Sequence, residues 1–216
     1  IAEVFPSLGE IKVALRKGRK WMQPRSAGVS FWFLPARAHI QPRPLGVVGI
    51  VVPWNYPLYL AIGPLVAALV AGNRALVKMS EYTPAFSALF EQLVADVFDP
   101  TEVAVVNGGP DVAAHFTRLP FNHLFFTGST LVGRKVMGAA AENLTPVTLE
   151  LGGKSPTVIA PGYPLEKAAQ RVLAGKLLNA GQTCIAPDYV FVHRDALAGS
   201  VEAMKHQARR MYPAGL

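Results

Sequence analysis

An apolar run over residues 45–52 is the feature that most constrains the fold of this chain. Such a run is typical of a strand buried on both faces of a parallel sheet. Strand-like and helix-like segments then alternate at β-α-β spacing. This predicts an α/β fold: an open, mostly parallel, Rossmann-like sheet with helices on both faces. The predicted order is strand 45–52, a buried helix to about 72, strand 75–79, helix 84–98, strand 103–106, a short helix to 116, strand 123–126, helix 130–142 and strand 146–151.

Three regions are predicted along the chain, with a domain boundary near Leu151. Residues 1–44 are expected to form an N-terminal helix and an extended arm, and residues 45–151 the parallel-sheet domain. Residues 152–216 are expected to form part of a second α/β domain. The finer predictions are a basic amphipathic helix at 7–22, extended segments at 29–34 and 38–41 around Pro35, strand 156–160, helix 164–180, strand 189–193 and helix 196–212.

Polar residues and glycines follow the predicted strands at their carboxyl ends. Ligands of open parallel sheets bind beyond these ends, so this convergence indicates a binding site. The residues concerned are Asn55 after the first strand, Lys78 to Glu81 after the second, Gly108-Gly109 after the third, Gly128-Ser129 after the fourth and Glu150 in the fifth.

Each of these motifs also has a simpler interpretation. Gly128-Ser129 precedes a helix whose free N–H groups could bind phosphate, but Gly-Ser is also an ordinary N-cap. Lys78 and Glu81 together suit a ribose diol, or form a surface ion pair. The Asn55 amide could donate to a developing oxyanion, or simply stabilise its Pro-rich turn.

Cys184 is the only cysteine of the chain, and it follows a predicted helix that ends at Gly181. A thiol that forms a covalent intermediate, together with a carboxylate that accepts a proton from water, suits acyl-transfer or aldehyde chemistry. Glu150 at the end of a strand would supply the carboxylate, and the two side chains would face each other across a cleft. The alternative is an inert buried cysteine, the more common role of a lone thiol.

Four motifs in register resemble those of the aldehyde dehydrogenases. They are Pro53-Trp-Asn-Tyr-Pro57, Phe126-Thr-Gly-Ser-Thr130, Leu149-Glu-Leu-Gly-Gly-Lys154 and Gly181-Gln-Thr-Cys184. The resemblance covers nearly the whole chain. Cys184-Ile-Ala-Pro-Asp-Tyr189 is most similar to the class 3 branch, and the segments 144–150 and 175–180 to bacterial coniferyl aldehyde dehydrogenases.

The resemblance implies oxidation of an aldehyde, aromatic and similar to coniferyl aldehyde, to its carboxylic acid. Cys184 would attack the aldehyde, the Asn55 amide and the Cys184 N–H would hold the oxyanion, and Glu150 would activate the water that hydrolyses the thioester. The cofactor implied is NAD, with NADP as the alternative, because Glu81 would repel a 2′-phosphate. No metal is implied. The cofactor-binding residues implied are Pro53, Trp54, Lys78, Ser80, Glu81, Gly109, Phe126, Gly128, Ser129, Val132, Gly133 and Leu151.

Composition bears on the other classes of protein. Hydrophobic residues make up 51% of the chain, which indicates a folded core. The net charge of +7 suggests a basic interaction module as an alternative, but no recognisable nucleic-acid-binding motif supports it, and we expect no nucleic-acid partner. The most apolar stretch, 57–71, is too short for a membrane span and contains Gly63-Pro64. A single cysteine fits a reducing compartment, so we expect a cytoplasmic protein.

The family's chains are longer than this one. They carry a later Glu-x-Phe-Gly-Pro motif and a C-terminal segment that returns to the first domain. We therefore expect an incomplete catalytic domain in residues 152–216, and a start that precedes Ile1, since no initiator Met is present. The parent protein is expected to be a homodimer or higher homo-oligomer. The alternative function is a truncated, non-catalytic dinucleotide-binding fragment of such an enzyme.

Overall fold

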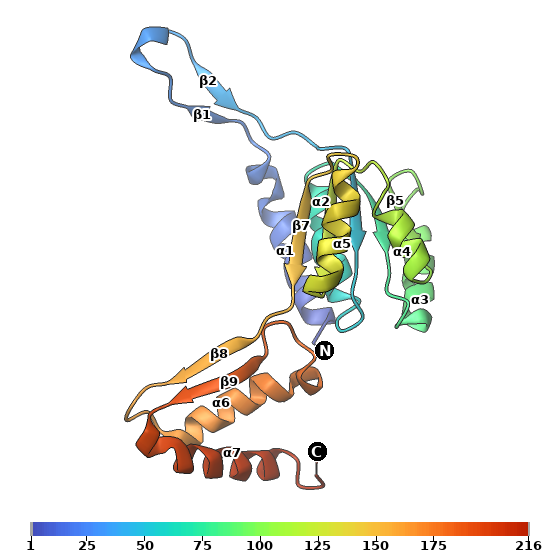
Figure 1. The fold of residues 1–216 in the computed structure, drawn as a ribbon. Coiled ribbons are helices and arrows are strands. Elements are labelled where there is room, and N and C mark those ends of the chain that lie inside the picture. Colours follow the sequence, from blue (N-terminus) through green and yellow to red (C-terminus); the bar gives the residue numbers. More distant parts are fainter. Residues whose placement is uncertain (1, 216) are drawn as a thin grey trace. The chain divides into compact units, whose positions relative to one another are not determined.

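The computed structural model describes residues 2–215, so the terminal residues of the predicted first and last regions, Ile1 and Leu216, lie outside the described residues. The chain forms two compact units, Ile1–Glu150 and Leu151–Leu216 (Figure 1). Each unit has its own sheet and its own helices, and each is described separately below.

The first unit is built on a five-stranded sheet with the order β5-β4-β3-β6-β7. Parallel pairing joins β3 to β4, β3 to β6 and β4 to β5. The predicted α/β class with a mostly parallel sheet is therefore confirmed. The strands are β3 (Val47–Val51), β4 (Arg74–Lys78), β5 (Val103–Val106), β6 (His123–Gly128) and β7 (Val147–Leu151).

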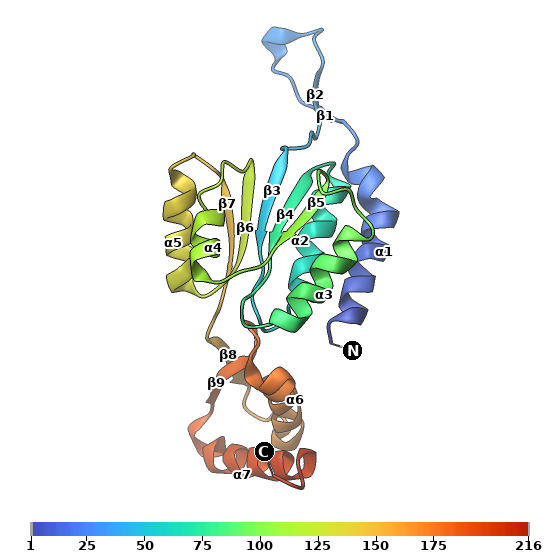
Figure 2. The same cartoon turned by 90° about the vertical axis from the view of Figure 1, so that its right-hand side faces the viewer.

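Helices cover both faces of this sheet. Figure 2 shows helices in front of and behind the strands. Right-handed crossovers place α2 and α3 on one face and α4 and α5 on the other, because the strand order reverses at β3. The central strands carry fully buried residues such as Ile50, Val77 and Leu124 because both of their faces are covered. The helices are α2 (Tyr59–Val70), α3 (Pro84–Ala95), α4 (Pro110–Phe116) and α5 (Thr130–Ala141).

Helix α1 (Val4–Trp21) packs against α2, which explains why α2 is apolar on nearly all sides. Gly18 permits this approach, because a Cβ there would lie 2.5 Å from Val70 Cγ1. The Glu3 carboxylate accepts hydrogen bonds from the N–H groups of Leu58 and Tyr59, at 2.8 and 3.1 Å. A carboxylate at a helix start satisfies free amides and the positive end of the helix dipole.

The arm after α1 is a hairpin. Strands β1 (Arg25–Ala27) and β2 (Ala38–Ile40) pair antiparallel. The prediction of an extended segment over 29–34 was wrong, because the chain forms the 3₁₀ turn η1 (Phe31–Phe33) there. Backbone bonds from Phe33 N to Ser30 O and from Leu34 N to Phe31 O close this turn, which reverses the chain between the strands.

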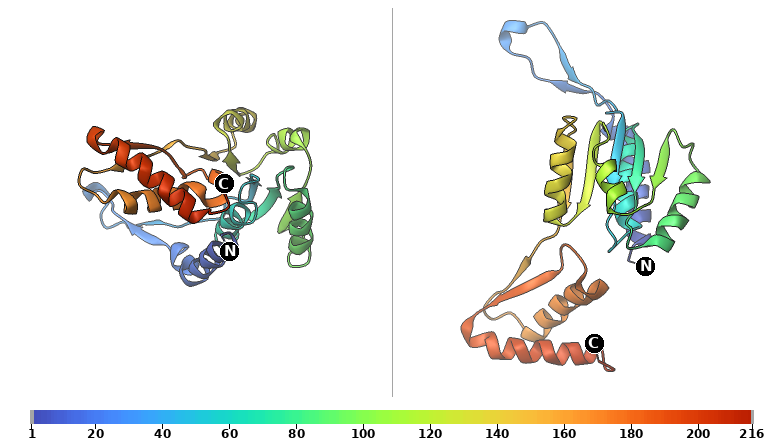
Figure 3. Two further views of the ribbon diagram at one scale, coloured as in Figure 1. Left: turned by 90° about the horizontal axis from the view of Figure 1, so that it is seen from below. Right: turned by 45° about the vertical axis from the view of Figure 1, so that its right-hand side comes forward.

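The second unit consists of two strands and two longer helices. β8 (Ser155–Ile159) and β9 (Pro187–Val192) pair in parallel, and α6 (Leu165–Leu177) lies between this pair and α7 (Leu197–Met211) (Figure 3). Small buried side chains such as Ala169 and Ala203 line the packed helix faces. Short 3₁₀ turns, η2 (Leu178–Gly181) and η3 (Arg194–Ala196), follow α6 and β9. The predicted helix 164–180 therefore ends earlier, since Asn179 and Ala180 adopt left-handed backbone angles.

Candidate active site

The register of the first sheet brings the predicted ligand-binding residues to one edge. Val51, the last residue of β3, lies opposite both Lys78 of β4 and Phe126 of β6. The Pro53–Asn55 turn, the β4–α3 loop and the start of α5 therefore all begin at neighbouring positions. The order of the strands reverses at β3: β4 and β5 are added on one side of it, and β6 and β7 on the other. Open α/β sheets bind their ligands at such a position.

Lys78 is a buried charge at this edge, only 1% exposed. Its Nζ donates to the Met79 carbonyl oxygen at 2.6 Å and lies 3.6 Å from Glu81 Oε2. Burial lowers the pKa of Lys78 below its ordinary value, and the Glu81 carboxylate opposes that shift. The alternative of a plain surface ion pair does not fit, because the lysine is enclosed while Glu81 stays partly exposed.

The loop that presents Glu81 is fixed by its own hydrogen bonds. Ser80 Oγ accepts from Tyr82 N at 3.2 Å, and the Ser80 carbonyl accepts from Ser87 Oγ at 3.0 Å. Thr83 is the N-cap residue of α3, but its hydroxyl donates to the Ser80 carbonyl and does not cap the helix. Glu81 is thereby held on a rigid turn directly after β4, beside its buried lysine partner.

Ser129 is the N-cap of α5, and its Oγ accepts from Val132 N at 3.3 Å. The ordinary capping role is thus present, and it leaves the positive end of the α5 dipole at the same edge as Lys78. Gly128 is required by packing, since a Cβ there would lie 2.5 Å from the Cζ of the buried Phe126. Val132 is largely exposed on the first turn of α5, whereas Gly133 is buried.

The remaining predicted residues of the first unit lie near the same sheet edge. Pro53, Trp54 and Asn55 form the turn after β3, and Trp54 is 44% exposed. Gly109 is the N-cap of α4, directly after β5. Glu150 is exposed close to the carboxyl end of β7, and Leu151 is the last residue of that strand.

Cys184 belongs to the second unit and is exposed, which argues against the alternative of an inert buried cysteine. It is the second residue of a turn that the Ala186 N–H closes onto the Thr183 carbonyl at 3.1 Å. Three consecutive residues with positive φ, Asn179, Ala180 and Gly181, precede this turn. An exposed thiol on a turn held by the backbone is suitably placed to act as a nucleophile.

Sequence reasoning missed a charged cluster close to this turn. The Asp188 carboxylate contacts Lys154 Nζ at 3.2 Å and Lys176 Nζ at 3.5 Å. The two lysines are 34 and 12 residues away from Asp188 along the chain, so no local pattern links them to it. Only the pairing of β8 with β9 and the position of α6 bring them together.

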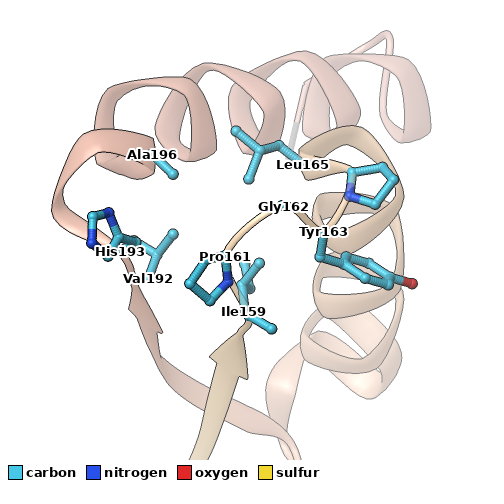
Figure 4. Close-up of a pocket in the computed structure, with 10 residues that line it drawn as sticks. Ile159, Pro161, Gly162, Tyr163, Leu165, Val192, His193 and Ala196 are labelled. Carbon is cyan, nitrogen blue, oxygen red and sulfur yellow. The ribbon is translucent and has the colours of Figure 1, made fainter.

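The second unit also contains an apolar hollow of about 390 Å³ at the carboxyl ends of β8 and β9. Figure 4 shows Pro161 at its centre, between Val192 and Leu165. Cys184 does not line it. The hollow is therefore separate from the turn that carries the thiol.

The structure thus gathers one set of predicted residues within the first unit, and places the thiol in the second. The expected facing of Glu150 and Cys184 is an arrangement between the units and stays a prediction. Within residues 2–215, no group of His, Cys, Asp and Glu side chains could hold a metal ion. Over the same residues, no helix has both the length and the apolar character needed to cross a membrane.

Comparison with known proteins gives a consistent result. The profile of the aldehyde dehydrogenase family matches residues 3–215. A "Probable coniferyl aldehyde dehydrogenase" of Pseudomonas aeruginosa is 53% identical over 213 residues, and a "Coniferyl aldehyde dehydrogenase" of a Pseudomonas species is 45% identical over 213 residues. These matches cover 99% of this chain but 45% and 44% of the relatives. The chain thus spans less than half the length of these curated relatives.

Solved structures agree with the sequence relatives. The substrate-bound state of Staphylococcus aureus AldH matches with a TM-score of 0.93 at 38% identity, over 97% of this chain and 46% of that one. A Mycobacterium tuberculosis aldehyde dehydrogenase complexed with NAD+ matches with a TM-score of 0.85 at 31% identity, over 94% of this chain and 42% of that one.

Proposed function

Because the chain belongs to the aldehyde dehydrogenase family, we propose that it contributes to the NAD-dependent oxidation of an aldehyde to a carboxylic acid. The observation that carries this proposal is the state of Cys184: the only thiol is exposed and held on a turn. Residues 45–151 would form the cofactor-binding domain, residues 152–216 part of the catalytic domain that carries the nucleophile, and residues 1–44 a helix and arm.

The cofactor would bind at the edge of the first sheet. The Lys78 ammonium would donate to one ribose hydroxyl, and the Glu81 carboxylate would accept from a ribose hydroxyl. Glu81 is partly exposed, so its carboxylate can reach a ligand, and Lys78 lies beside it. The start of α5 at Ser129 would lie by the pyrophosphate, with Val132 near the adenine. Bound NAD would supply the hydride acceptor. The carboxylate of Glu81 favours NAD over NADP, because it repels a 2′-phosphate.

The chemistry at Cys184 would proceed through two covalent stages. The thiolate sulfur adds to the aldehyde carbon, and the resulting oxyanion accepts hydrogen bonds from the Asn55 amide and the Cys184 backbone N–H. Loss of hydride leaves a thioester on Cys184. Glu150 then takes a proton from water as the water attacks the thioester, which releases the carboxylic acid and the free thiol.

The remaining residues of the proposed cofactor site lie in or beside the elements that end at the same edge. They are Pro53, Trp54, Ser80, Gly109, Phe126, Gly128, Gly133 and Leu151. Phe126 is buried, so its part is to fix the backbone at Gly128. The similarity to coniferyl aldehyde dehydrogenases favours an aromatic aldehyde as the substrate, and we propose a homodimeric or larger parent protein in the cytoplasm.

The test is NADH formation, followed by its absorbance, with NAD and coniferyl aldehyde. We expect Cys184→Ala to abolish turnover, and Glu150→Gln to slow release of the acid while the thioester still forms. Ile185→Ala is the matched control, because Ile185 is exposed in the same turn and carries no chemistry. Turnover that survives Cys184→Ala would rule out the proposed mechanism.

A second candidate is a dinucleotide-binding fragment without catalysis. The observation that favours it is that Lys78, Glu81 and the start of α5 all lie in the first unit, whereas Cys184 lies in the second. It predicts NAD binding that requires Lys78, together with no NADH formation in either the unaltered chain or Cys184→Ala. Cys184-dependent turnover by the 216-residue chain would exclude this candidate.

A further inference from the structure

The pairing of β8 with β9 is irregular at Asp188. Ser155 of β8 pairs with Pro187 of β9, but the next residue, Pro156, pairs with Tyr189. Asp188 is therefore an extra residue in β9, opposite no partner in β8. A bulge of this kind redirects a side chain out of the strand's regular alternation, and bulges are common beside active sites.

The redirected carboxylate joins two segments that are distant along the chain. Lys154 lies directly before β8, and its Nζ donates to Asp188 Oδ1 at 3.2 Å. Lys176 lies in the last turn of α6, and its Nζ is 3.5 Å from the same oxygen. The hydrogen bond from Lys154 is the main cause that lowers the pKa of the Asp188 carboxyl, and Lys176 adds to it.

These three residues bracket the turn that carries the thiol. Lys176 precedes the turn in the sequence and Asp188 follows it. The turn also lies close to the residue before Lys154, because a Cβ added at Gly153 would be 3.4 Å from the carbonyl oxygen of Cys184. On the other side, a Cβ at Gly175 would lie 3.3 Å from the ring of Pro187. The start of β9 therefore packs closely against the end of α6.

The segment between the two ends has little regular structure of its own. Asn179 and Ala180 hold left-handed angles, with φ of 51° and 54°, which residues other than glycine adopt only at an energetic cost. Backbone hydrogen bonds in this segment run from Gln182 N to Asn179 O and from Ala186 N to Thr183 O. A strained segment persists only where its surroundings hold it in place.

We infer that Asp188 is a positioning residue for the nucleophile, which ties Lys154 and Lys176 together and so holds both ends of the Cys184 turn. The inference rests on the proposed function for its catalytic meaning, but the contacts concern this unit alone. A single exposed ion pair contributes little, whereas a carboxylate shared by two lysines restrains three segments at once. The bulge at Asp188 is what makes this shared contact available.

The test measures the turn directly, in the 216-residue chain, by hydrogen exchange and by thiol alkylation. In Asp188→Asn we expect the amides of Gln182 and Ala186 to exchange about tenfold faster, because the restraint on both ends is lost. Lys176→Gln should have the same effect on exchange. Asp188→Glu, which keeps the carboxylate, should restore most of the protection. Asp195→Asn is the matched control, since it removes one charge from an exposed site of the same unit.

Alkylation of Cys184 by iodoacetamide gives a second readout on the turn, and the chain offers no other thiol. Asp188→Asn and Lys176→Gln should change the alkylation rate in the same direction and by a similar factor, because each removes the same restraint on the turn. Asp188→Glu should return the rate to nearly that of the unaltered chain. Circular dichroism melts would confirm that each variant is folded. If one variant does not fold, the other provides the test.

Unchanged exchange at Gln182 and Ala186 in the folded variants would overturn the inference. So would alkylation rates that move in opposite directions in Asp188→Asn and Lys176→Gln, since that pattern indicates an effect of charge and not the loss of a shared restraint. Neither readout needs NAD or an aldehyde. If turnover instead survives Cys184→Ala, the proposed function fails while the restraint by Asp188 stands.

Discussion

Lys78 is a buried charge whose position lowers stability, and in the proposed function it binds the cofactor. Its ammonium is enclosed, with one carbonyl and one carboxylate as partners, and its pKa lies below the ordinary 10.5 because of burial. Between that lowered pKa and about 10.5, the unfolded chain binds more protons than the folded chain. The free energy of unfolding therefore rises with pH through this window, and the cost of the buried charge is felt in full below it.

Replacement by the similarly shaped, uncharged methionine tests this account. We expect Lys78→Met to raise the thermal midpoint at pH 7, because Glu81 stays hydrated and the buried charge is gone. The rise in stability between pH 8 and 10.5 should be smaller than in the unaltered chain. NAD binding should weaken at least about tenfold, since a charged hydrogen bond is lost. Calorimetry gives both quantities; a lower midpoint together with unchanged NAD affinity would contradict the account.

Among the elements, the end of β6 and the start of α5 show how closely the backbone is packed at the proposed cofactor edge. Gly128 lies against the ring of Phe126, and that ring is buried and cannot move outward. Gly138 in the middle of α5 offers a contrast, because nothing lies within 4 Å of the position of its Cβ. The same substitution should therefore have opposite effects at two sites ten residues apart.

We expect Gly128→Ala to destabilise the chain by about 1–3 kcal/mol through overpacking. Gly138→Ala should stabilise it by about 0.5–1 kcal/mol, because alanine is favoured over glycine inside a helix. Urea unfolding measures both changes. Equal changes in the free energy of unfolding for the two variants would mean that the Phe126 ring moves away from the new methyl group, and that packing does not require Gly128.

For the whole molecule, the division into two units separates most of the residues proposed to bind the cofactor from the proposed nucleophile. The residues proposed to hold NAD lie within the first unit, except Leu151, the last residue of β7, with which the second unit begins. The thiol and its charged cluster lie in the second unit. Cofactor binding should then need only the first unit, whereas oxidation needs both.

A chain of residues 1–151 should accordingly fold and bind NAD with a Kd within about threefold of that of the 216-residue chain. Titration calorimetry measures this, with Lys78→Met in the same short chain as the control that should lose affinity. A folded short chain without NAD affinity would show that the second unit supplies part of the cofactor site.

The sequence by itself determined the elements and the edge where polar residues collect. The strand at 103–106 was predicted with the bounds of β5, and the position of Ser129 at a helix start followed from its residue type. Such features depend on neighbours a few residues away, so apolar periodicity and capping patterns are enough to identify them. The prediction failed at 29–34, where β-branched and aromatic residues favoured a strand but the reversal between β1 and β2 required a turn.

Only the tertiary structure decided which of these residues meet. The order β5-β4-β3-β6-β7 encloses Lys78 and places Phe126 across β3 from it, and no local pattern encodes either fact. The same holds for Asp188, which meets Lys154 across 34 residues because β9 pairs with β8 and bulges there. Residue types limit the chemistry that a chain can perform, but burial, charge pairing and register depend on contacts between distant segments, which exist only once the chain has folded.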